Sequence, residues 1–91
     1  MEFEWGEKKN QENIKKHGIS FEYASYVFDD EYLVEEYDET HSDDEDRYDV
    51  IGMVDDVLFV VCTYRENDKI IRLISARVAI KAERNKYYGN R

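Results

Sequence analysis

The chain has 91 residues, of which 22 are acidic and 13 basic, so its formal net charge is −9 at pH 7. Aromatic residues make up 14% of it, which is too high for a disordered acidic polypeptide, and no apolar run is long enough to span a membrane. The first residues lack the apolar core of a signal peptide, and the single cysteine, Cys62, cannot form an internal disulfide. We therefore expect one domain over residues 1–91 that lies in a reducing cytoplasm and has no membrane partner.

A polar helix is predicted at residues 7–16, where charged and amide side chains dominate. Ile14 is its single candidate for an interior contact, and Phe3 and Trp5 can supply apolar packing just before it. Gly18 follows, and glycine is the usual residue just beyond a helix end.

A second helix is predicted to begin after Ser20, whose hydroxyl suits the N-cap position. Ile19 and Ala24 flank this start with the spacing of a hydrophobic staple. Phe21, Ala24 and Phe28 then recur on one helical face, which indicates a helix packed against a core.

The rest of the chain is rich in β-branched and aromatic residues, interrupted by turns. Strands are predicted at 31–37, 47–54, 57–64 and 69–76, and a closing helix at 79–88. Asp55-Asp56 and Asn67-Asp68 are the expected turns, and the run 41–46 is an expected solvated loop. The fold class is therefore α+β, with two N-terminal helices, a three- to four-stranded antiparallel sheet and a C-terminal helix. The helices should cover one face of the sheet and leave the other partly open.

Charge is unevenly distributed along the chain. Residues 29–56 carry fourteen acidic and one basic residue, whereas residues 65–91 carry three acidic and eight basic residues. An acidic protein repels nucleic acid at long range, yet a local basic surface can still bind phosphate. This asymmetry permits an RNA site in the C-terminal third and predicts another use for the acidic middle.

Two arginines of the predicted hairpin can be placed by register. If the chain turns symmetrically about Asn67-Asp68, Arg65 and Arg72 are diagonal neighbours on one sheet face, with Thr63 opposite Arg72. Two like charges at this distance need an anion or carboxylate between them. Arg77 has the opposite parity on a straight strand, so we expect it beyond the strand end. The alternative is that these are surface arginines paired with the acidic loop.

The sequence of several segments resembles that of the BrnT toxin family. These proteins are small ribonucleases of bacterial type II toxin–antitoxin pairs with a RelE-like fold. The most specific segments are Lys16–Phe21, Thr63–Arg65 and Ile71–Arg77, followed by Glu83-Arg84. The resemblance implies RNA cleavage without a metal or cofactor, in the bacterial cytoplasm. It also implies a ribbon-helix-helix antitoxin partner, through which alone operator DNA would be contacted. The sequence departs from the family at Gly6, where an acidic residue is usual, and in its more acidic middle.

Cleavage of this kind uses the 2′-hydroxyl of the RNA itself, so the protein must supply cations and a proton shuttle. Arg65, Arg72 and Arg77 are the candidate phosphate ligands, because the guanidinium fork matches phosphate oxygens. His17 is a candidate shuttle with Lys16 beside it. A polar helix end explains both residues equally well.

The predicted closing helix carries three further candidates. Glu83 could act as a base or orient Arg77, and equally it could only pair with Arg84 or Lys86 on a solvated helix. Arg84 and Tyr88 are candidate RNA-binding residues, since aromatic rings stack on unpaired bases. We expect Tyr87 or Tyr88 to pack in the core.

Other chemistry is disfavoured by the sequence. The acidic run 43–46 lacks the spaced ligands of a calcium loop, His41 within the loop reads as solvated, and Cys62 in an apolar run reads as a buried structural thiol. The leading interpretation is a metal-independent endoribonuclease toxin. A catalytically inactive toxin relative that binds protein, and an acidic mimic of nucleic acid, are the alternatives from other classes.

Overall fold

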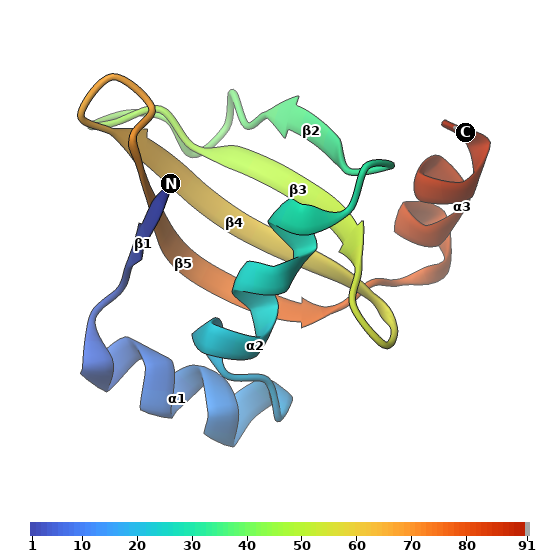
Figure 1. Cartoon of the computed structure of the whole chain (residues 1–91), viewed down its shortest axis with the longest axis horizontal. Coiled ribbons are helices and arrows are strands. Elements are labelled where there is room, and N and C mark those ends of the chain that lie inside the picture. Colours follow the sequence, from blue (N-terminus) through green and yellow to red (C-terminus); the bar gives the residue numbers. More distant parts are fainter. Residues whose placement is uncertain (91) are drawn as a thin grey trace.

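The computed structural model describes residues 1–90 and contains a five-stranded sheet with helices packed on it (Figure 1). In chain order the elements are β1 (Glu2–Glu4), α1 (Glu7–His17), α2 (Phe21–Ser25), the 3-10 helix η1 (Tyr26–Asp29), β2 (Val34–Tyr37), β3 (Tyr48–Met53), β4 (Val57–Arg65), β5 (Ile70–Val78) and α3 (Lys81–Gly89). The α+β class, the four predicted strands and the C-terminal helix are confirmed.

The sheet has one more strand than the sequence predicted, and it is mixed rather than antiparallel. Its order is β1-β5-β4-β3-β2, and β1 runs parallel to β5, with Glu4 beside Arg72. The prediction of three or four antiparallel strands was wrong, because it missed β1, which is only three residues long. Phe3 was read as a contact of the following helix, whereas β1 pairs with an edge of β5 that would otherwise be unpaired.

The two N-terminal helices lie where they were predicted. Gly18 ends α1 in the left-handed conformation, with φ of 73°. Ser20 caps α2, since its Oγ accepts a hydrogen bond from the backbone N–H of Tyr23 at 3.0 Å. The second helix is shorter than expected: it becomes η1 after Ser25, and Val27 rather than Phe28 is fully buried there.

The prediction that Ile14 is the interior contact of α1 was wrong. Ile14 is 37% exposed, while Asn10 and Asn13 are buried. The Asn13 amide donates to the carbonyls of Ile19 and Ala76 at 2.8 and 2.9 Å, and its Oδ1 accepts from the Ala76 N–H at 3.2 Å. A polar residue faces the sheet here because the edge of β5 beyond β1 has backbone groups that need partners.

An apolar cluster lies on each face of the sheet. Alternate strand residues, such as Val50, Val60 and Leu73, pack with Phe21 and Ala24 beneath α1 and α2. On the other face Ile51, Val57 and Tyr87 form a smaller cluster under α3. The prediction that all helices cover one face was therefore wrong. α3 covers one end of the second face, and the rest of that face is open.

Candidate functional site

Arg65, Arg72 and Arg77 all lie on the sheet face that points away from α1 and α2, which we call the open face. The predicted hairpin register is confirmed, since Thr63 pairs with Arg72 and Arg65 pairs with Ile70. Because Leu73 is buried on the covered face, its neighbour Arg72 points to the open one.

A β-bulge brings Arg77 to the same face. The register of β4 and β5 shifts between Val61 and Cys62, so that Ile74 is an extra residue on β5. Leu73 and Ala76, three residues apart, are both buried in the same core as a result. The prediction that Arg77 lies beyond the strand end was wrong: it is inside β5, and the bulge reverses its parity. Its guanidinium carbon lies 4.4 Å from the centre of the Phe59 ring.

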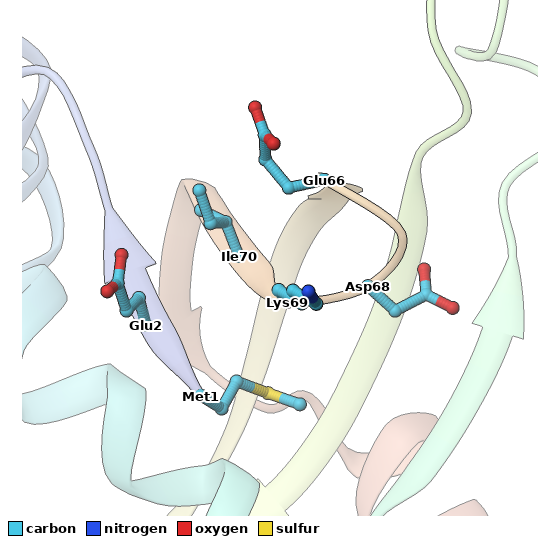
Figure 2. Close-up of a pocket in the computed structure, with 6 residues that line it drawn as sticks. All are labelled: Met1, Glu2, Glu66, Asp68, Lys69 and Ile70. Atoms are coloured by element: carbon cyan, nitrogen blue, oxygen red, sulfur yellow. The ribbon is translucent and has the colours of Figure 1, made fainter.

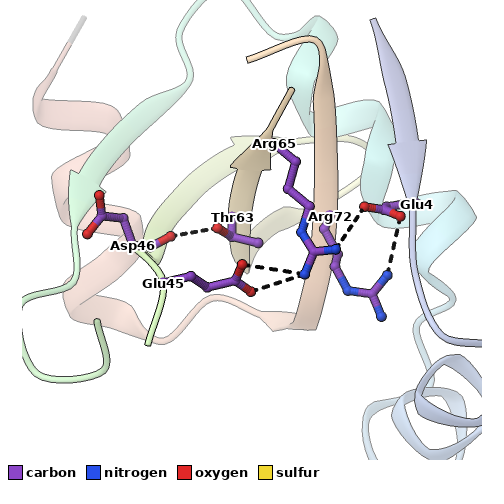
Figure 3. Close-up of polar contacts among 6 residues, drawn as sticks. All are labelled: Glu4, Glu45, Asp46, Thr63, Arg65 and Arg72. Carbon is purple, nitrogen blue, oxygen red and sulfur yellow. Dashed lines mark hydrogen bonds and ion pairs between the residues drawn. The ribbon is translucent and has the colours of Figure 1, made fainter. Parts of the chain in front are cut away.

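Arg65 and Arg72 share a carboxylate, as their proximity required. Glu4 of β1 accepts from Arg65 Nη1 and pairs with Arg72 Nη1, both at 3.5 Å (Figure 3). Arg65 Nη2 also contacts the two carboxylate oxygens of Glu45 at 3.3 and 3.4 Å. The acidic loop is held close by Thr63, whose hydroxyl donates to the carbonyl of Asp46 at 2.7 Å. In this structure the guanidinium groups of Arg65 and Arg72 are therefore engaged by carboxylates.

Gly6 also lies beside this cluster. A Cβ atom added to it would be 3.8 Å from Arg72 Nη2. An acidic side chain at this position would therefore point toward Arg72. In the present chain Glu4, two residues earlier, supplies a carboxylate to the same guanidinium.

Arg77 and Glu83 form a bidentate ion pair, with both Nη–Oε distances at 2.8 Å. Glu83 Oε1 also accepts the backbone N–H of Ile80 at 2.9 Å, at the start of α3. Burial opposes ionisation of Glu83, but the hydrogen bonds from Arg77 and Ile80 outweigh it and lower its pKa. Both oxygens of Glu83 are thus engaged in positioning Arg77 and α3, which does not suit a general base.

The other candidates on α3 have separate environments. Arg84 Nη1 donates to the Ala79 carbonyl at 2.8 Å, so this side chain braces the start of the helix. Tyr87 is buried and its hydroxyl donates to Asp30, as expected for a core residue. Tyr88 is 49% exposed, and its ring centroid lies 5.2 Å from that of Tyr87.

Lys16 and His17 are not brought to the arginines by any contact. They form the last turn of α1, where Lys16 is exposed and His17 half-buried. Within residues 1–90 their side chains make no hydrogen bond or ion pair. Lys16 does follow Lys9 by two helical turns, so the two lysines lie on one flank of α1, roughly 10 Å apart.

A basin on the open face contains a carboxylate that sequence reasoning missed. The basin has a volume of about 450 Å³, and Asp49, Lys9 and Arg47 are among the charged residues that line it. Asp49 Oδ1 is buried, and no donor among residues 1–90 reaches it. Burial first, and then the carboxylates of Asp38 and Glu36, raise the pKa of Asp49. The available signal was a lone charge inside an apolar strand, YDVIGM.

The acidic loop that borders the basin is internally ordered. His41 Nδ1 lies 2.9 Å from Asp38 Oδ2, and the hydrogen bond from this imidazole lowers the pKa of Asp38. His41 is exposed, as predicted for a loop residue. Within residues 1–90, no three histidine, cysteine or acidic side chains are placed to share a metal ion.

A larger hollow, of about 560 Å³, lies at the hairpin tip, away from these residues (Figure 2). Glu2, Glu66 and Asp68 line it together with Lys69. Acidic side chains outnumber basic ones around this hollow, which does not suit phosphate binding, and none of the candidate site residues borders it. Cys62, the expected structural thiol, is fully buried, and burial raises its pKa to about 12.

The family model described as "Ribonuclease toxin, BrnT, of type II toxin-antitoxin system" matches residues 5–83, which is most of the chain. A comparison with curated proteins found no match. None of the helices within residues 1–90 is long and apolar enough to cross a membrane.

Proposed function

This chain belongs to the BrnT family of ribonuclease toxins of type II toxin–antitoxin systems, and we propose that it is an endoribonuclease that cleaves RNA without a metal ion. The proposal includes a RelE-like fold and attack by the 2′-hydroxyl of the substrate on the neighbouring phosphorus. The observation that carries it is the alignment of Arg65, Arg72 and Arg77 on one face, which depends on the bulge at Ile74.

The three arginines are spread along β4 and β5 rather than gathered on one phosphate. Arg72 and Arg77 are five residues apart on the same strand, or at most about 16 Å at 3.3 Å per residue. This spacing suits a track that binds separate phosphates along a single strand. Arg77, held over the Phe59 ring by its bidentate pair with Glu83, has the shortest ion pair of the three and is our candidate for the scissile phosphate.

The remaining candidates have supporting roles in this proposal. Lys16, on the flank of α1 beside β5, adds positive charge, and the exposed ring of Tyr88 can stack on a base. Arg84 donates through Nη1 to the Ala79 carbonyl, so in this proposal it stabilises the start of α3. Glu83 positions Arg77. His17 makes no contact that supports a proton shuttle, and the geometry gives it no advantage over another group.

Membership in the family implies an antitoxin partner. We propose that this partner is a ribbon-helix-helix protein that binds operator DNA, so that the toxin reaches DNA only through it. Such a protein must carry a basic DNA-binding surface, and residues 29–56, with fourteen acidic side chains, offer opposite charge. The cytoplasm is the compartment in which this pair would act.

One observation favours a second candidate function, that of an inactive relative which acts as a protein-binding module. Glu4 and Glu45 already pair with Arg65 and Arg72, so an RNA phosphate must displace a carboxylate to bind there. A chain that no longer cleaves RNA could keep these pairs for stability alone.

The test is cleavage of a labelled single-stranded RNA by the purified, antitoxin-free protein in EDTA. We expect cleavage by the wild type, and a loss of about 100-fold or more for Arg77→Ala and for Arg65→Ala. Lys69→Ala, an exposed cation at the hairpin tip, is the matched control and should keep its activity. Absence of cleavage both on free RNA and on translating ribosomes would leave the binding module as the function.

A further inference from the structure

The basin on the open face has the size and lining of a site for part of a nucleotide. Its lining comes from β3, β4 and β5, from the loop that joins β2 to β3 and from Lys9 of α1, and its volume of about 450 Å³ is in the range of small-molecule sites. Val61 and Ile74 provide an apolar floor, and Lys9 and Arg47 stand at its rim. Phe59, which carries the Arg77 guanidinium on its ring, forms another wall.

Among residues 1–90, Asp49 is the one carboxylate that a strand places in the floor of this basin. Its register partner is Val61, so its side chain stands in the middle of the sheet rather than at an edge. One of its oxygens, Oδ1, is buried and lacks a donor among residues 1–90. A buried polar atom without a partner costs free energy, so its persistence calls for a ligand or a functional reason.

The charges that face Asp49 come from every neighbouring element. Glu36 of β2 and Asp38 and His41 of the loop lie on one side, and Arg77 of β5 and Glu83 of α3 on the other. Lys9 of α1 and Arg47 border the same basin. The carboxylates and burial oppose ionisation of Asp49, and a bound phosphate held by Arg77 would stand next to it.

We infer that this basin seats the ribose on the 5′ side of the scissile bond and that Asp49 accepts the proton of its 2′-hydroxyl, an inference that rests on the proposed ribonuclease function. The proton passes to the Asp49 carboxylate, the 2′-oxygen forms a bond to phosphorus, and the bond from phosphorus to the 5′-oxygen breaks. The leaving oxygen takes a proton from solvent. The products are a 2′,3′-cyclic phosphate and a 5′-hydroxyl end, and Asp49 returns its proton to water.

The test compares Asp49→Asn with Asp68→Asn in the full chain, free of antitoxin. Asp68 is an exposed residue of the hairpin turn with φ of 68°, a conformation that asparagine tolerates. We expect Asp49→Asn to lower the single-turnover rate by about 100-fold or more. Its dissociation constant for a fluorescent 2′-O-methyl oligoribonucleotide, which cannot be cleaved, should stay within about threefold of the wild type or tighten, because a buried acidic group is removed. Asp68→Asn should match the wild type in both measurements.

A second readout does not depend on a variant that folds. The logarithm of the wild-type rate should rise with slope one as pH increases and level off at the pKa of the Asp49 carboxyl, as measured by carbon NMR. The same 2′-O-methyl oligonucleotide should shift the NMR signals of Asp49 and Ser75, both of which line the basin.

Each outcome supports or overturns the inference. The catalytic role is overturned if Asp49→Asn cleaves RNA within threefold of the wild-type rate. It is also overturned if the wild-type rate does not level off at the pKa of Asp49. In both cases the ribonuclease function stands. If the wild type cleaves no RNA, the proposed function and the catalytic role both fail. The NMR shifts then test binding in the basin by itself. Shifts at Asp49 and Ser75 support the basin as the ribose site, and their absence overturns it.

Discussion

The covered face and the open face of the sheet carry different side chains on the same strands. On β4, Val60 and Cys62 are completely buried under α1 and α2, whereas Val61 on the open face is only half-buried. The covered face is almost wholly apolar. The open face holds three arginines, several of their carboxylate partners and a buried oxygen of Asp49 without a donor. Packing of one face therefore supplies the stability that allows the other to keep charged groups near its centre.

The largest effect that tests this division is expected at Asn13, a polar residue on the covered side. Asn13→Ala removes three hydrogen bonds and leaves backbone groups of Ile19 and Ala76 without partners, so we expect a loss of about 3 kcal/mol. Urea denaturation measures it. Ile14→Ala, the neighbouring change, should cost less than about 1 kcal/mol because Ile14 is 37% exposed. If the two variants unfold at the same urea concentration, the amide does not hold α1 to β5.

An intermediate effect, of opposite sign, is expected on the open face. The pKa of Asp49 is raised in the folded protein by burial and by the carboxylates of Asp38 and Glu36, so ionisation of Asp49 destabilises the fold. Asp49→Asn should therefore raise Tm at pH 7 by about 2–4 °C, which corresponds to about 0.5 kcal/mol for a group that is partly screened by solvent.

The pH dependence of this gain has a definite sign. The native protein holds the Asp49 proton more tightly than the unfolded chain, so the stabilising effect of that proton is complete below the ordinary aspartate pKa, near 4. It is lost as pH rises through the raised pKa. The difference in Tm between the variant and the wild type should thus vanish in acid and appear toward neutral pH. A gain that persists unchanged at low pH would point to packing instead of charge.

The smallest effect is expected where an arginine meets the acidic loop. Glu45→Gln removes one of the two carboxylates that contact Arg65, and both side chains are about 40% exposed, so stability should change by less than about 0.5 kcal/mol. Affinity for the 2′-O-methyl oligonucleotide should rise about two- to fivefold, since phosphate no longer competes with Glu45. Fluorescence anisotropy at fixed salt measures this affinity.

Asp43→Asn is the matched control for this loop, because it changes the same amount of charge at a residue that does not pair with Arg65. It should alter the affinity less than Glu45→Gln. Equal effects of the two variants would mean that general charge on the loop, and not the contact with Arg65, limits RNA binding.

The parts of the fold that the sequence predicted are those with local causes. Ser20 and Gly18 mark helix ends through their own side-chain and backbone chemistry, and both were confirmed. The register of the β4–β5 hairpin followed from the turn at Asn67-Asp68, because side chains alternate along a strand and a short turn sets which residues face each other. The same register predicted that Arg65 and Arg72 lie together on one face.

Tertiary structure alone decided the rest of the candidate site. The three-residue strand β1 exists because the edge of β5 offers it partners, and it brings Glu4 to Arg72. The bulge at Ile74 turns Arg77 to the open face, and no residue of β5 signals it. The environment of Asp49 depends on the loop and helices packed around it. A pattern of residues determines local conformation, whereas edge pairing, bulges and burial depend on segments far away in the chain, which only the folded molecule brings into contact.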